Sequence, residues 1–114
     1  MGNRILGGRG FGSNAVKGIV RVCLTSADIK VKLQKGDILA IGVLSDEDVP
    51  VVASRAAGII AEDGGLTSAA AFIYVICGRP VILGAERATD LLEDGVFVTL
   101  DPAVGAVYEG DISL

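Results

Sequence analysis

Residues 62–71 read Glu-Asp-Gly-Gly-Leu-Thr-Ser-Ala-Ala-Ala, and this stretch decides how the rest of the chain is interpreted. A Gly-Gly turn is followed by two hydroxyl residues and then by an apolar run. Because Ser and Thr side chains accept hydrogen bonds from the first backbone N–H groups of a helix, Thr67 or Ser68 is expected to cap a helix over Ala69–Cys77. Gly78 ends that helix, as glycine commonly does after a last helical turn.

The turn before this helix has two interpretations that the residues alone leave open. Backbone N–H groups, two hydroxyls and the positive end of the helix dipole face one spot, which suits an anion. The candidate anion-binding residues are Gly64, Gly65, Thr67 and Ser68. The alternative is a well-capped buried helix with no ligand. The loop Glu62–Gly65 is expected to need unusual backbone angles, with a positive φ at Gly65, so that Gly65→Val costs about 1–3 kcal/mol.

Working outward, short apolar segments alternate with short helical ones. A helical turn or loop is expected over Thr25–Lys35, with Ser26 or Asp28 as its cap, and a short helix over Glu86–Leu92. Ser45 is expected to cap a helix that runs to Ala57 and is stopped by Gly58. The segments with strand character are Val16–Leu24, with Gly18 as a bulge or close-approach point, Ile38–Val43, Ile59–Ala61, Val81–Leu83, Val96–Leu100 and Ala106–Tyr108.

This alternation predicts a mixed α/β fold with parallel and antiparallel pairing in one or two small sheets. The last two strand segments are expected to form a hairpin across Asp101–Gly105. Residues 1–14 are rich in glycine and show no period. With 114 residues, the chain is expected to form a single domain over residues 1–114.

Composition excludes several classes of function. The net charge is −4, aromatic residues make up 4% and Trp is absent, so neither nucleic acid nor an anionic membrane is expected as a partner. The chain contains no histidine. Ser-His-Asp triads, Cys-His dyads, His metal sites and phosphohistidine therefore cannot be built from it, and no metal site is expected.

The remaining motifs indicate a cytoplasmic protein without a cofactor. Cys23 and Cys77 show no metal-ligand spacing and are expected to be buried, reduced thiols. Residues 1–10 lack the apolar stretch of a signal peptide, and the longest apolar run, Ala69–Cys77, is too short to span a bilayer. Gly10–Ala15 fits the loose dinucleotide pattern but leads into a strand instead of a helix, so it is expected to be a surface turn or docking loop.

Several segments together resemble one known family. Gly64-Gly65-Leu66-Thr67-Ser68 followed by Ala70-Ala71 is similar to the signature of the swivelling phosphohistidine domain of phosphoenolpyruvate (PEP)-utilising enzymes. Gly78–Gly84 is similar to the Gly-x-Pro-x-x-x-Gly segment after the helix of that family. The ending Gly105–Gly110 looks most like the C-terminal extension of some bacterial pyruvate kinases. PEP synthase, pyruvate phosphate dikinase and enzyme I of the sugar phosphotransferase system carry the same domain.

The resemblance implies a swivelling β/β/α domain that carries phosphoryl groups. In the family, a histidine in the first turn of the helix takes phosphate from PEP and passes it to a second site. The position of that histidine is Ala69 in this chain. A methyl group has no lone pair, and no other histidine exists to replace it. No catalytic residue is therefore expected, and Ala69 is the position of the lost nucleophile.

Three hypotheses follow from this resemblance. In the first, the chain is a non-catalytic, structural or regulatory C-terminal domain of a pyruvate-kinase-like enzyme of glycolysis, and its partners are the catalytic domains of that PEP/pyruvate phosphotransferase and other copies of the same enzyme in a homo-oligomer. In the second, it is the carrier domain of a PEP synthase or dikinase whose histidine became Ala69. In the third, it is a free-standing module that binds PEP or phosphate.

Overall fold

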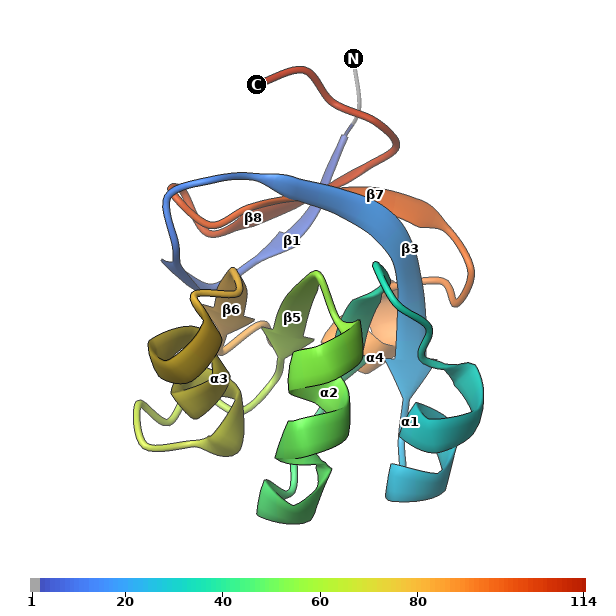
Figure 1. The fold of residues 1–114 in the computed structure, drawn as a ribbon. Coiled ribbons are helices and arrows are strands. Elements are labelled where there is room, and N and C mark those ends of the chain that lie inside the picture. The colour runs from blue at the N-terminus through green and yellow to red at the C-terminus, as the bar shows by residue number, and fades with distance from the viewer. Residues whose placement is uncertain (1–2) are drawn as a thin grey trace.

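Three layers make up the molecule, and the helices form one of them. The computed structural model describes residues 3–114, so the first two residues of the predicted single domain lie outside the described part. Helices α1, α2 and α3 cover one face of a sheet whose other face packs on an antiparallel sheet (Figure 1). The helices are α1 (Ser26–Lys32), η1 (Asp46–Asp48), α2 (Val49–Arg55), α3 (Ala69–Cys77) and α4 (Ala88–Leu91). The layers confirm the mixed α/β prediction.

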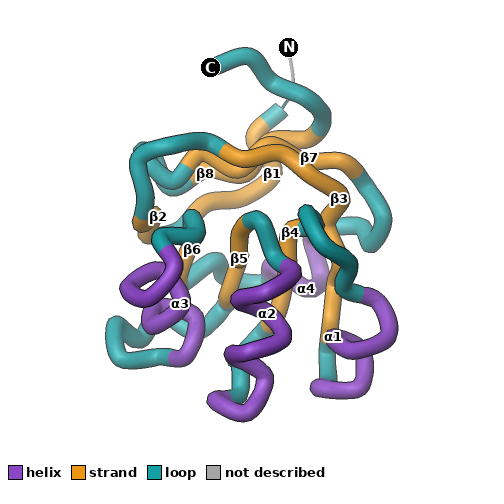
Figure 2. Tube along the Cα trace, in the orientation of Figure 1, coloured by secondary structure: helices purple, strands orange, loops and turns teal. Residues whose placement is uncertain are grey.

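Eight strands form one continuous sheet that folds over on itself (Figure 2). They are β1 (Arg4–Gly7), β2 (Arg9–Phe11), β3 (Val16–Cys23), β4 (Ile38–Ile41), β5 (Gly58–Ala61), β6 (Val81–Leu83), β7 (Phe97–Asp101) and β8 (Ala106–Glu109). Their order is β1-β8-β7-β3-β4-β5-β6-β2. Strands β3 to β6 pair in parallel, whereas β1, β8, β7 and β3 pair antiparallel. The long strand β3 belongs to both parts and joins them.

The central strands are buried on both faces and therefore separate two cores. Side chains in a strand alternate between its faces, so Ile38 and Ala40 of β4 face the antiparallel sheet while Leu39 and Ile41 face the helices. The core under the helices takes Ile29, Val52 and Ile73 from α1, α2 and α3. The core between the parallel and antiparallel parts of the sheet takes Ala88 from α4 and Leu92, the residue after α4. It also takes Val98, Leu100 and Val107 from β7 and β8. This arrangement is the β/β/α sandwich that the resemblance implied.

Two short strands lie in the glycine-rich residues 3–14, although the sequence shows no period there. Strands β1 and β2 follow one another with only Gly8 between them, yet β1 pairs with β8 and β2 pairs with β6. One segment thus closes both edges of the sheet. A Cβ atom at Gly10 would lie 1.9 Å from the carbonyl oxygen of Pro102. Glycine is therefore needed in the Gly10–Ala15 pattern for close backbone packing, and no helix follows it.

Local signals predicted most element ends, with some corrections. Helix α3 and strand β6 have the expected bounds, and the hairpin of β7 and β8 is confirmed. Helix α1 forms, but its cap is Thr25, whose side chain accepts a hydrogen bond from the N–H of Asp28. Strand β4 ends at Ile41, two residues before the predicted end.

Two further corrections concern the segment before α2 and strand β3. Ser45 makes no capping hydrogen bond, and α2 ends at Arg55. Gly58 opens β5 instead of stopping the helix. Gly18 is a close-approach point and not a bulge, because β3 keeps a regular register against β7 while a Cβ atom would lie 2.6 Å from the carbonyl oxygen of Gly36.

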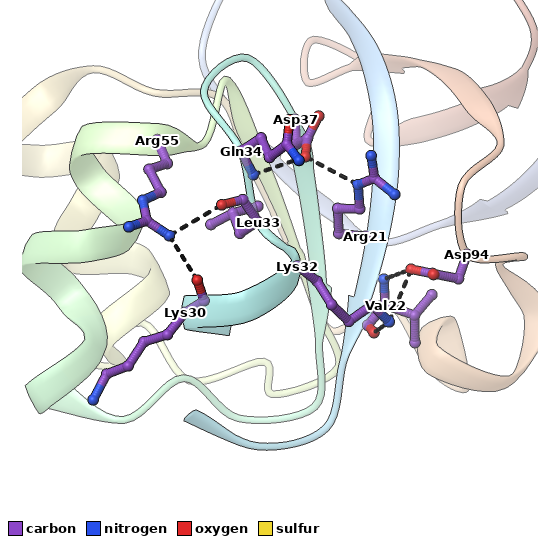
Figure 3. Close-up of polar contacts among 9 residues, drawn as sticks. All are labelled: Arg21, Val22, Lys30, Lys32, Leu33, Gln34, Asp37, Arg55 and Asp94. Atoms are coloured by element: carbon purple, nitrogen blue, oxygen red, sulfur yellow. Dashed lines mark hydrogen bonds and ion pairs between the residues drawn. The ribbon is translucent and has the colours of Figure 1, made fainter. Parts of the chain in front are cut away.

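Polar contacts fix β3 to the elements on both sides of it (Figure 3). The Nε of Arg21 donates to the carboxylate of Asp37 at 3.0 Å, and that carboxylate also accepts from the N–H of Gln34. The N–H of Val22 and the Nζ of Lys32 both approach the carboxylate of Asp94, at 2.7 Å and 3.1 Å. Burial raises the pKa of Asp94, but these two donors outweigh burial, so its pKa is lowered below the ordinary value.

The two cysteines have different environments, so the expectation of two buried thiols is wrong for one of them. Cys23 is buried at the end of β3, whereas Cys77 is exposed at the end of α3, and both are free thiols. Burial raises the pKa of Cys23 from 9.0 to about 11, against the smaller lowering effect of Lys32. Among the described helices, none combines the length and the apolar character needed to cross a membrane.

Candidate functional site

The candidate site lies where two parallel strands end and two helices begin. Strand β4 leads through residues 42–45 into η1 and α2, and the adjacent parallel strand β5 leads through residues 62–68 into α3. Loops that follow the carboxyl ends of parallel strands come together at one edge of the sheet. The amino ends of α2 and α3 therefore lie next to each other, with the Gly-Gly turn before α3.

Hydrogen bonds within the chain hold the Gly-Gly turn. The carboxylate of Asp63 accepts from the N–H of Gly65 at 2.9 Å, and the carbonyl of Gly65 accepts from the N–H of Ser68 at 3.2 Å. The hydroxyl of Ser68 accepts from the N–H of Ala71 at 3.3 Å. Ser68 is therefore the N-cap, which decides between the two residues that the sequence left open, and Thr67 is exposed.

The prediction of a positive φ at Gly65 is wrong. Seven glycines adopt a positive φ among the described residues, and neither Gly64 nor Gly65 is one of them. A Cβ atom at Gly65 would lie 3.3 Å from the carboxylate oxygen of Asp63, a side chain that can move. The turn closes through the hydrogen bonds of Asp63 and not through left-handed backbone. Backbone strain therefore gives no reason to expect that Gly65→Val lowers the free energy of unfolding.

An open cavity of about 400 Å³ lies between the starts of α2 and α3. From α3 and the residues before it, Thr67, Ser68, Ala69 and Phe72 line the cavity, while α2 and η1 contribute Asp46, Val49 and Pro50. Gly64 and Gly65 are not part of its lining. The structure thus places two of the four predicted anion-binding residues at one cavity beside Ala69.

Ala69 is the first residue of α3 and is only 6% exposed. Its methyl group cannot accept a phosphoryl group, since it has no lone pair. The adjacent Ser68 hydroxyl serves as the helix cap, and the cavity lining holds one carboxylate, Asp46, and no cationic side chain. Among the described residues, no hydrogen bond joins the carboxylate of Asp46 to the hydroxyl of Thr67 or Ser68.

Sequence reasoning missed the contribution of α2 to this cavity. Asp46, Val49 and Pro50 come from a segment whose residues predicted the start of a helix but no part in a site. The parallel pairing of β4 with β5 brings that start beside Ser68, and the order of strands could not be derived from the sequence pattern. In the part of the chain that the structure describes, no group of three or more His, Cys, Asp or Glu side chains is placed to hold a metal ion.

Comparison with known proteins gives a consistent result. Residues 33–105 match the family model described as PEP-utilising enzyme, mobile domain. The chain is 41% identical to a pyruvate kinase of Geobacillus stearothermophilus over 94% of its own length, and 37% identical to a probable phosphoenolpyruvate synthase of Archaeoglobus fulgidus over 97%. It spans only 18% and 14% of those two proteins.

Solved structures show the same fold at low sequence identity. An aconitase X structure from Thermococcus kodakaraensis superposes with a TM-score of 0.68 and 20% identity, covering 93% of this chain and 98% of that chain. An enzyme I structure superposes with a TM-score of 0.59 and 22% identity, covering 70% of this chain and 33% of that chain. At such identities, the likeness concerns the fold alone.

Proposed function

Since the chain belongs to the family of the mobile domain of PEP-utilising enzymes, we propose that it is a non-catalytic module of a pyruvate-kinase-like enzyme with a structural or regulatory role. Transfer of phosphate between PEP and ADP would then be carried out by domains outside this chain. Its partners are the catalytic domains of that enzyme, and its location is the cytoplasm. The relatives support this proposal, because the chain corresponds to 12–19% of their length.

The observation that carries the proposal is Ala69. It occupies the first position of α3, directly after the capping residue Ser68. Backbone N–H groups at a helix start can stabilise a charged group, but phosphoryl carriage also needs an atom that forms the bond to phosphorus. Neither Ala69 nor any histidine provides one. A module of this family without that atom acts through its surface.

Deletion of this domain from the enzyme that carries it tests the proposal. We expect the truncated enzyme to retain catalysis, because its chemistry is located elsewhere, and to change in subunit assembly, thermal stability or response to effectors. Size-exclusion chromatography with light scattering, thermal unfolding and kinetic assays measure these properties. Unchanged assembly, stability and effector response would reject the structural or regulatory role.

A second candidate function is a phosphoryl carrier of a PEP synthase or dikinase that has lost its nucleophile. The cavity beside Ala69 favours this candidate, because it leaves space next to the position where an imidazole would stand. If it holds, Ala69→His should gain an acid-labile phosphate when PEP and the other domains of the enzyme are supplied. The unsubstituted chain is the control and should gain none, and absence of phosphate on Ala69→His counts against the candidate.

A third candidate is a module that binds PEP or phosphate at the Gly-Gly turn. Thr67 and Ser68 at the cavity favour it, whereas the N–H of Gly65 already donates to Asp63. Titration with phosphate or PEP, followed by the amide resonances of Gly64, Gly65, Thr67 and Ser68, tests this candidate. Amide shifts that saturate with ligand would support it, and unchanged amides at millimolar ligand would leave the helix cap as the role of the turn.

A further inference from the structure

One face of α3 carries a row of apolar side chains that are each exposed by half or more. Phe72, Val75 and Ile76 stand three and four positions apart, so they lie on the same side of the helix. Their exposed fractions are 52%, 75% and 50%, and Leu66 in the turn before the helix is 58% exposed. We call these four residues the α3 patch. The opposite side of the helix, with Ala70 and Ile73, is buried in the core.

The α3 patch is free of charge, and one carboxylate, that of Asp46, lies at one end of it. None of the nine residues of α3 is charged. Asp46 and Phe72 line the same cavity, so a carboxylate lies beside the amino-terminal end of the patch, and the next residue, Glu47, is exposed. Apolar patches of this kind are found at protein contacts. A surface that fits this one is apolar in its centre and carries Lys or Arg opposite Asp46.

The two ends of the described chain lie far from the α3 patch. Figure 1 shows the start of β1 and the C-terminal end beyond the antiparallel sheet, on the side opposite α1, α2 and α3. Any polypeptide that continues from either end therefore joins the domain at the face opposite the helices. The helix layer then faces outward from the attachment point and can meet another part of the same enzyme.

The size of the α3 patch argues against a stable dimer of this chain. A nine-residue helix is about 14 Å long. Four side chains of at most about 200 Å² each, a little more than half exposed, offer roughly 500 Å². Stable interfaces bury about 800 Å² on each partner. A tether changes this requirement, because it holds the two surfaces at an effective concentration in the millimolar range.

From these observations we infer that the α3 patch docks reversibly on an apolar surface with a basic rim, located on the larger part of the enzyme that carries this domain. The inference rests on the proposed function, since it requires that this chain is a module of a larger enzyme. It adds the face that makes the contact and the chemistry of the surface that receives it.

Cys77 provides a natural probe, because it is exposed on α3 next to Ile76. The experiment compares the rate of alkylation of Cys77 by N-ethylmaleimide in the 114-residue chain and in the enzyme that carries it, with peptide mass spectrometry to separate the two cysteines. Cys23 does not interfere because it is buried. Docking is expected to slow alkylation of Cys77 in the enzyme by about threefold or more, as the effective concentration exceeds the dissociation constant.

Two valine variants test whether the protection of Cys77 depends on the α3 patch or on any exposed apolar side chain. Val75 is 75% exposed on α3, and Val31 is 81% exposed on α1. Val75→Ser is expected to remove most of the protection of Cys77 in the enzyme, while Val31→Ser is expected to leave it unchanged. Each variant is also measured in the 114-residue chain, so that a direct effect on the thiol is subtracted.

Three outcomes would overturn the inference. Equal rates in the chain and in the enzyme would show that α3 stays free. Equal loss of protection in Val75→Ser and Val31→Ser would show that the patch is not specific. Protection that rises with the concentration of the isolated chain would make a second copy the occupant.

The inference and the proposed function can fail independently. If deletion of the domain changes nothing but Cys77 is protected, the docking inference stands and the structural or regulatory role fails. If deletion changes assembly or regulation but Cys77 is alkylated equally fast in the chain and in the enzyme, the role stands and another face makes the contact.

Discussion

The carboxylate of Glu62 accepts two hydrogen bonds from Thr89, one from the backbone N–H at 2.8 Å and one from the hydroxyl at 2.7 Å. Glu62 directly follows β5 and begins the loop that leads to α3, while Thr89 lies in the first turn of α4. The N-cap position of α4, Arg87, makes no capping hydrogen bond. Glu62 thus supplies the cap of α4 from a distant part of the sequence. It connects the loop before α3 to the helix that packs in the core between the two parts of the sheet.

Loss of the Thr89 hydroxyl should destabilise this connection. Thr89→Val keeps the size of the side chain but leaves one lone pair of the partly buried Glu62 carboxylate without its donor. Hydrogen bonds to charged groups contribute about 1.5–3 kcal/mol, so we expect a loss in that range from urea unfolding. Thr67→Val is the control, because Thr67 is exposed. Equal unfolding midpoints for the two variants would contradict the expectation.

Removal of the α3 cap should have a smaller effect. Ser68→Ala deletes the hydroxyl that accepts from the N–H of Ala71, and loss of an N-cap costs about 1 kcal/mol. Thr67→Ala should change the free energy of unfolding by less than about 0.5 kcal/mol, as is usual at exposed positions. Thermal unfolding of the two variants measures the difference. If Thr67→Ala were the more damaging change, the assignment of the cap to Ser68 would be wrong.

A side chain at position 10 should destabilise the fold, because Gly10 packs closely against the backbone of Pro102. Gly10→Ala would place a methyl group 1.9 Å from a backbone oxygen of Pro102, and overpacking of this kind costs about 1–3 kcal/mol or more. Gly65→Ala is the matched control, since its added methyl meets only the movable carboxylate of Asp63 and its φ is not positive. We expect the control to stay within about 0.5 kcal/mol of the unsubstituted chain. Denaturant unfolding of both variants tests this difference.

Stability should fall at alkaline pH because of Cys23. Its pKa is raised from 9.0 to about 11 by burial in the folded state. The folded protein then binds more protons than the unfolded chain between these pH values, so the contribution is complete below pH 9 and is lost as the pH rises toward 11. Two pKa units correspond to about 3 kcal/mol.

The control for this pH dependence is Cys23→Ala, which cannot ionise at that position. We expect the decline in unfolding free energy between pH 9 and 11 to be less steep for Cys23→Ala than for the unsubstituted chain. Equal slopes for the two proteins would mean that the decline comes from other groups.

Sequence signals predicted those parts of the site that depend on neighbouring residues. The bounds of α3 and its C-cap at Gly78 follow from a few consecutive residues. Helix caps and turns are made by hydrogen bonds between groups about two to four positions apart. For the same reason, the pattern left Thr67 and Ser68 as alternatives, because both lie within reach of the first N–H groups.

Residues far apart in the sequence account for the errors. The φ of Gly65 depends on how Asp63 folds back over the turn, which composition does not reveal. The strands in residues 4–11 are too short to show a period and exist because β8 and β6 offer free edges to them. Cys77 is the last residue of an apolar run, but it lies on an exposed side of the helix.

The sequence by itself determined that this chain cannot form a phosphohistidine in any conformation, since it contains no histidine. It also determined the alternation of short strands and helices, because apolar periodicity is a local property. Only the tertiary structure decided that Asp46 and Phe72 share a cavity, that Glu62 caps α4 and that the α3 patch faces outward. These relationships depend on the order in which the strands pair. That order depends on contacts between residues far apart in the sequence, which a local pattern does not reveal.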